Sequence, residues 1–117
     1  MKTFRTLLLI LFVLSFLLPT PATFAQGEDA KAEAIKLASE GLKLYQAARY
    51  QEALAKFQAA LSLAQKAKDR DIEGVVLNGI GVAYYALGQY SQSLDYYQQA
   101  LVIAKEIGNR KDEGVML

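Results

Sequence analysis

The chain has 117 residues, and its first 25 hold both prolines, two basic residues and no acidic one. The other 92 residues carry 11 Lys/Arg and 12 Asp/Glu, and this near balance argues against a nucleic-acid-binding protein, which would need a clustered basic excess. Cys and His are absent, which excludes thiolate and imidazole metal sites, Cys or Ser–His nucleophiles and disulfides.

Residues 1–25 have the features of a secretory signal peptide. Lys2 and Arg5 precede an apolar run at 7–18, and small residues lead up to Ala25. We expect cleavage after Ala25 and a secreted or periplasmic protein. The apolar run is shorter than the roughly 20 residues that span a membrane, so we expect membrane contact only if this segment stays uncleaved.

The rest of the chain repeats itself with a period of 40 residues. Aligning 33–77 with 73–117 gives 15 identical pairs among 45, including Gly41 with Gly81 and Tyr50 with Tyr90. Gly74-Val75 recurs as Gly114-Val115. The sequence therefore predicts two complete units and the beginning of a third.

Each unit is predicted to be a pair of helices. In the second unit, apolar residues recur at helical spacing over about 71–87 and 90–107, and no segment alternates with the period of a strand. Gly88 is suited to the turn between these helices, Ala48 has the equivalent place in the first unit, and Gly108-Asn109 is suited to the next junction. We expect Asp71 to cap the helix that follows it.

These residues resemble the tetratricopeptide repeat (TPR), whose pattern includes L-G-x₂-Y followed by A-x₃-F. The second unit offers Ile80-Gly81 and Tyr84, and the first offers Ala53 and Phe57. The 40-residue period, with Gly-Asn-Arg at 108–110, is similar to the long repeats of kinesin light chains and spindle-orientation scaffolds. The resemblance implies an all-α fold, a right-handed solenoid of stacked antiparallel helix pairs. The residues expected to pack the helices are Gly41, Tyr50, Ala53, Phe57, Ala60, Gly81, Tyr90, Ser93, Tyr97 and Ala100.

This interpretation divides the chain into five segments. We expect a signal peptide at 1–25, a lead-in to the first helix at 26–33, a first repeat at 34–67, a second repeat at 74–107, and the start of a truncated third repeat at 108–117.

The resemblance implies a binding groove along the first helix of each unit. The positions expected to face it are Ile35, Ala38, Leu42, Tyr45, Val75, Asn78, Val82 and Tyr85. A protein or peptide segment is the implied ligand. The alternative, which the apolar character of these positions favours, is that they are buried against neighbouring repeats or a second copy of the chain, for instance in a homodimer formed through the open repeat end.

Two segments imitate sites of other classes. Asp69, Asp71 and Glu73 have the spacing that opens a calcium loop, but the twelfth position is Ile80 instead of glutamate. Gly79-Ile-Gly81 is half of a dinucleotide fingerprint with no strand before it. We therefore expect no metal, no cofactor and no catalysis.

Two functions remain open at this point. The first is an exported, non-catalytic interaction module that binds on the groove or through the open end of the repeats. The second is the amino-terminal part of a larger protein, for example one with a caspase-like peptidase domain that is absent here.

Overall fold

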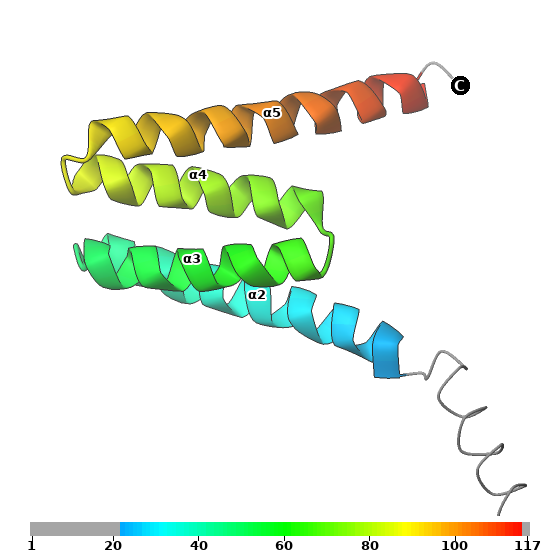
Figure 1. Cartoon of the computed structure of the whole chain (residues 1–117), viewed down its shortest axis with the longest axis horizontal. Helices are drawn as coiled ribbons and strands as arrows, with labels where there is room; N and C mark the ends of the chain where they lie inside the picture. Colours follow the sequence, from blue (N-terminus) through cyan, green and yellow to red (C-terminus); the bar gives the residue numbers. More distant parts are fainter. Residues whose placement is uncertain (1–21, 116–117) are drawn as a thin grey trace, which may run out of the picture.

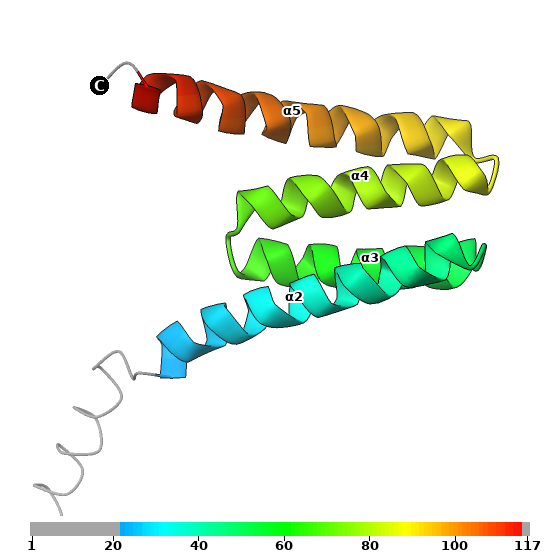
Figure 2. The same cartoon turned by 180° about the vertical axis from the view of Figure 1, so that it is seen from behind.

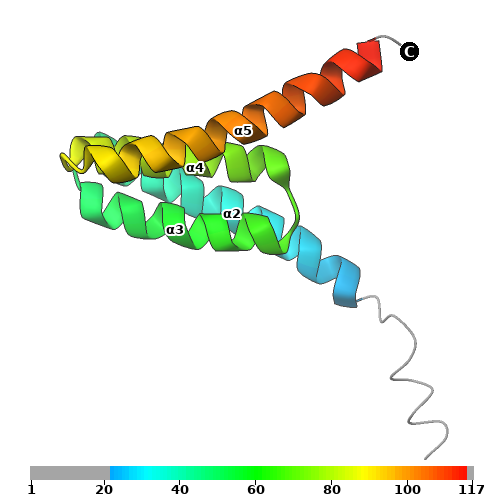
Figure 3. The same ribbon diagram turned by 45° about the horizontal axis from the view of Figure 1, so that its top comes forward.

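The computed structural model describes residues 22–115, with side chains for 26–111, and contains four helices and no strand over that range. They are α2 (Ala22–Gln46), α3 (Tyr50–Lys66), α4 (Arg70–Ala86) and α5 (Tyr90–Val115). Consecutive helices are antiparallel and stack in one direction (Figures 1 and 2). Helices α2 and α4 form one layer and α3 and α5 the other (Figure 3). The predicted all-α repeat solenoid is confirmed.

The three turns between the helices have the same conformation. In each, the middle residue has positive φ: Ala48 (61°), Lys68 (55°) and Gly88 (77°). The residue after it donates a backbone hydrogen bond to the carbonyl five residues back, for example Gln89 to Tyr84 at 2.9 Å. This is the Schellman arrangement, which satisfies the last carbonyls of a helix. Helices therefore begin every 20 residues, at Tyr50, Arg70 and Tyr90.

The cap of α4 is Asp69 and not Asp71. The Asp69 side chain accepts a hydrogen bond from the backbone N–H of Ile72 at 3.1 Å. The prediction for Asp71 was wrong because the Schellman turn ends at Asp69, which places Asp71 inside the first helical turn. A carboxylate there still faces the positive end of the helix dipole.

The core lies between α3 and α4. Val76, Ile80 and Ala83 of α4 are almost completely buried against the apolar stripe of α3, whose buried residues are Ala53, Leu54, Phe57 and Ala60. These side chains recur three or four positions apart, so each helix presents one apolar face to the next. Tyr50 is half-buried, whereas Tyr90, which we also expected to pack, is largely exposed.

Residues 40 apart have equivalent neighbours. The Cα of Gly41 lies against the ring of Phe57, and the Cα of Gly81 lies in the same way against the ring of Tyr97. A Cβ at either glycine would come within 3 Å of the ring. Two tyrosine pairs repeat as well: Tyr45 with Tyr50 (ring centroids 5.3 Å apart) and Tyr85 with Tyr90 (5.1 Å). The contacts between side chains therefore recur every 40 residues, as the sequence does.

The two ends of the stack differ from the predicted segments. Helix α2 begins at Ala22, so the predicted lead-in at 26–33 is helical, and the rest of the predicted signal peptide lies outside the described residues. Helix α5 continues through Gly108 and Asn109, where a turn was predicted (Figure 3). Glycine and asparagine permit a turn without imposing one, and among the described residues no later helix packs against α5.

Within residues 22–115, no helix combines the length and the apolar character that crossing a membrane requires.

Candidate interaction groove

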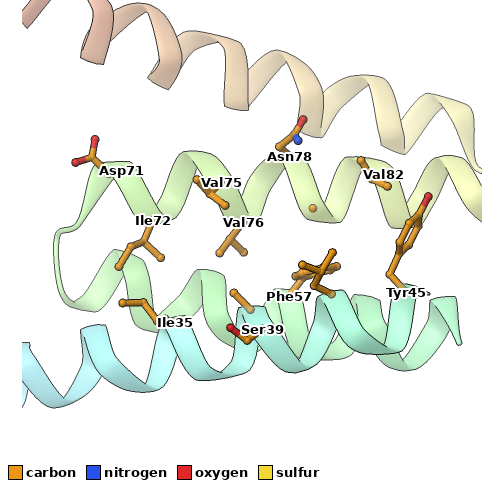
Figure 4. A pocket seen from close by; sticks show the side chains of 13 residues that line it. Ile35, Ser39, Tyr45, Phe57, Asp71, Ile72, Val75, Val76, Asn78 and Val82 are labelled. Carbon is orange, nitrogen blue, oxygen red and sulfur yellow. The ribbon is translucent and has the colours of Figure 1, made fainter. Parts of the chain in front are cut away.

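A hollow of about 540 Å³ lies between α2 and α4, with α3 beneath it. We call it the A-groove (Figure 4). The ring of Phe57 forms part of its floor, Ile35 and Leu42 of α2 form one wall, and Val75 and Val82 of α4 form the other. The walls are apolar and open to solvent: Ile35 is 49% exposed, Leu42 51% and Val75 71%.

The A-groove exists because glycine lies where α4 crosses the aromatic ring of α3. A Cβ at Gly79 would lie 3.1 Å from the ring of Phe57, and a Cβ at Gly41 on the other side would lie 2.8 Å from it. Phe57 is therefore held between two glycines of different repeats. This contact fixes the separation of α2 and α4 and hence the width of the groove.

Seven of the eight positions expected to face a groove line this hollow: Ile35, Ala38, Leu42, Tyr45, Val75, Asn78 and Val82. Tyr85 does not, and its exposed ring packs edge-on against Tyr90. The reason is geometric. A groove needs a first helix on each side, and α4 is the last such helix among the described residues.

Six lining residues were not among the predicted groove positions: Ser39, Phe57, Asp71, Ile72, Val76 and Gly79. Phe57, Ile72 and Val76 were not predicted to line a groove, because they belong to the core as well as to the groove floor. The signal that could have found them is the glycine at 79, since a small residue next to a buried ring leaves space on the adjoining surface.

Polar groups lie at the edges of the A-groove. Asp71 lies at one end and Tyr45 at the other, and the Asn78 amide points away from α2 (Figure 4). Among the lining residues only Asp71 is charged, and none is basic. The arrangement can bury apolar side chains and offer an amide at the rim. Its lining residues include no cation that could bind a terminal carboxylate.

A second hollow, of about 460 Å³, lies between α4 and α5, and we call it the end hollow. Asp71, Val75 and Asn78 line both hollows, so this row of α4 forms the ridge between them. The other walls come from α4 and α5: Gly74, Tyr97, Ala100, Leu101, Ile103, Ala104 and Ile107.

Ion pairs tie the helices together around these hollows. Arg70 of α4 donates hydrogen bonds to Glu106 of α5 and to Glu73, and these bonds, the one to Glu106 foremost, raise the pKa of Arg70. Lys56 lies 3.1 Å from Glu40, and its hydrogen bond and charge lower the pKa of Glu40. Glu73 is buried, whereas Arg70, Glu106, Lys56 and Glu40 are near the surface, so the Arg70–Glu106 and Lys56–Glu40 pairs contribute little to stability.

Within the part of the chain that the structure describes, no three acidic side chains gather as a metal site would require. The carboxylates of the calcium-like segment have other partners. Asp69 accepts from Ile72 and pairs with Lys31 at 3.4 Å, and Glu73 pairs with Arg70 at 3.1 Å.

A family model of the tetratricopeptide repeat matches residues 44–106, more than half of the chain. The chain belongs to the tetratricopeptide repeat family. The match spans most of α3, α4 and α5, whose packing carries the 40-residue period. The TPR is a scaffold for contacts between proteins, and that general role comes with the family. No curated protein and no solved structure matches this TPR chain. The likeness to the long repeats of kinesin light chains stays a prediction.

Proposed function

We propose that this TPR chain is an exported, non-catalytic interaction module that binds a segment of another protein in the A-groove. The observation that carries the proposal is the exposed apolar wall of that groove. Ile35, Leu42 and Val75 contribute little to the core, yet they surround one hollow whose floor includes the buried ring of Phe57. Exposed apolar side chains that are clustered in this way mark a binding surface, whereas single exposed apolar residues are common and need no such explanation.

The lining favours one kind of segment. Apolar side chains of the ligand would enter between Ile35 and Val75, where they lose contact with water. Asn78 lies on the ridge between the two hollows, and its amide could donate to and accept from a ligand backbone that crosses this ridge. The carboxylate of Asp71 favours a ligand with a basic residue at that end of the groove.

We propose that the chain acts by binding another protein and not by catalysis. The sequence contains no His and no Cys. The one carboxylate of the A-groove, Asp71, is exposed at its edge, whereas an acid catalyst usually needs a carboxyl that is shielded from water.

Export remains part of the proposal, on the strength of the basic and then apolar residues at 1–25. Amino-terminal sequencing of the protein recovered outside the cytoplasm should begin at or within a few residues of Gln26. A protein that retains Met1 in the membrane fraction would favour the uncleaved tether.

The alternative is that the chain is the front of a larger TPR protein whose effector domain, for example a caspase-like peptidase, follows. The recurrence of Gly74-Val75 as Gly114-Val115 favours it, because it begins a third copy of the unit. Reading the DNA after codon 117 decides between the two, since further repeats in frame would establish the larger protein.

Site-specific photo-crosslinking tests the A-groove directly. A photoreactive amino acid replaces Leu42 or Val75 in the groove, and Gln58 on the exposed side of α3 serves as the matched control. We expect the groove positions to capture the same cell-envelope protein and Gln58 to capture none of it. Equal capture from all three positions would show that the contact is not specific to the groove.

A further inference from the structure

The end hollow is equivalent to the place where α4 itself docks in the first unit. Leu54 of α3 is 8% exposed because α4 covers it, whereas its equivalent on α5, Leu94, is 57% exposed. Ala64 is fully buried, whereas its equivalent, Ala104, is exposed. Equivalent apolar side chains thus lie on α3 and on α5, and among the described helices only those on α3 are covered by a following helix. We call Leu94, Tyr97, Leu101 and Ala104 the open face of α5.

Helix α4 shows what such a face binds. It covers α3 with Ile72, Val76, Ile80 and Ala83, which recur at helical spacing along one side. Gly79 lies between them and allows α4 to approach the ring of Phe57. On the open face the equivalent ring is that of Tyr97, which already contacts Gly81 on its inner side. A helix with a small residue opposite Tyr97 would therefore complete the arrangement.

Within the described residues, a second copy of this chain has no such helix on its surface. Its α4 is already packed in its own core. Its α2 carries Lys36, Glu40 and Lys43 where α4 carries Val76, Ile80 and Ala83, so stacking α2 on the open face would bury charges against apolar side chains. Its α5 has no glycine between Tyr90 and Ile107. The stack is therefore polar at its α2 end and apolar at its α5 end.

We propose that the open face of α5 binds an amphipathic α-helix of a partner protein, with apolar residues at i, i+4, i+8 and i+11 and glycine at i+7. This is the spacing of Ile72, Val76, Ile80 and Ala83 with Gly79. The bound helix runs antiparallel to α5, as α4 runs to α3, and fills the end hollow of about 460 Å³. The inference rests on the proposed role as an interaction module and names the partner at its open end.

A peptide copied from α4 of this chain can test the proposal. A fluorescent peptide with the sequence of residues 69–87, which includes Asp69 as the cap and all of α4, is titrated into the full chain. We expect saturable binding, with NMR shift changes centred on Leu94 and Leu101. Leu101→Arg should weaken binding about tenfold, since a charge then faces the apolar side of the peptide. Leu101 is already 54% exposed, so the variant should fold, and circular dichroism checks this.

Two matched controls make the experiment specific. Leu42→Arg places the same charge in the A-groove and should leave peptide binding within about twofold. A peptide with Gly79→Leu is more apolar and a better helix former, yet it should bind about tenfold more weakly because leucine collides with Tyr97.

The inference would be overturned if no binding is seen by about 1 mM peptide, if Leu42→Arg weakens peptide binding as much as Leu101→Arg does, or if the Gly79→Leu peptide binds as tightly as the native one. A dimer of the chain that Leu101→Arg dissociates would also overturn it, because the second copy would then be the occupant. In-frame repeats after codon 117 would also overturn it, because the next repeat would then cover α5. If the peptide fails while photo-crosslinking at Leu42 still captures a partner, only the inference about the open face fails.

Discussion

The hydroxyl of Ser93 donates a 2.7 Å hydrogen bond to the backbone carbonyl of Gly81, and Ser93 is almost completely buried. Forty residues earlier, Ala53 and Gly41 have the same places without such a bond. The second unit therefore adds a polar link between its two helices where the first unit has only packing.

Replacing Ser93 with alanine should cost at most about 1 kcal/mol in the free energy of unfolding. The Gly81 carbonyl stays paired, because the regular bonding of α4 gives it a second donor. Urea denaturation measures the change. Ser93→Val is the contrasting variant and should cost about 1–3 kcal/mol through overpacking. A larger loss from alanine than from valine would contradict this explanation.

Gly41→Ala and Gly81→Ala should differ, although the two positions are equivalent. Both substitutions improve helix propensity by about 1 kcal/mol. At Gly41 the new Cβ meets the ring of Phe57, which Gly79 blocks on its other side. At Gly81 it meets Tyr97, whose outer side is open. We expect Gly41→Ala to be less stable than Gly81→Ala by about 1–3 kcal/mol, measured by urea denaturation. Equal stabilities would show that both rings move freely.

Lys68→Gly should stabilise the protein by about 0.5–1 kcal/mol, because Lys68 has a φ of 55° and side chains disfavour that conformation. Lys68→Ala removes the charge and keeps the strain, so it serves as the control and should change little. Gly88→Ala should cost about 1 kcal/mol, since Gly88 has the same conformation in the next turn. Thermal and urea unfolding of the three variants checks these values. A destabilised Lys68→Gly would contradict the assigned conformation.

Much of this architecture follows from the sequence because small residues recur where helices must approach. Gly41, Gly81, Phe57 and Tyr97 were expected to pack the helices, and in the structure each glycine lies against one of these rings. The period of 40 also recurs in the pairs Tyr45–Tyr50 and Tyr85–Tyr90. Seven of the positions expected to face a groove line one hollow, because they share one face of helices that the repeat sets side by side.

The failures have a common physical cause. Glycine permits a turn and does not impose one, so Gly108 is helical, since no later helix within residues 22–115 packs there. In contrast, packing drives Lys68 into a turn that its side chain disfavours. Tyr85 packs against Tyr90 and lines no groove, because α4 is the last first helix of a unit among the described residues. Which of two nearby aspartates caps α4 depends on where the preceding turn ends, and that is a detail of backbone hydrogen bonding.

The Glu40–Lys56 pair should give a small dependence of stability on pH. Because Lys56 lowers the pKa of Glu40 in the folded chain, the pair stabilises the protein above the ordinary pKa of glutamate, and that contribution disappears as pH falls through the lowered value. The difference in stability between the native chain and Lys56→Gln should therefore shrink as the pH falls from about 6 to 3. NMR titration should show a higher pKa for Glu40 in the variant. An unchanged pKa would contradict the pairing.

The most direct test of the 40-residue stack with one open end compares two leucines. Leu54→Ala removes a side chain that α4 covers, and Leu94→Ala removes its equivalent from the open face of α5. By urea denaturation we expect Leu54→Ala to cost about 2–4 kcal/mol and Leu94→Ala less than about 1 kcal/mol. Equal costs would contradict the account, because they would mean that the two leucines are equally covered.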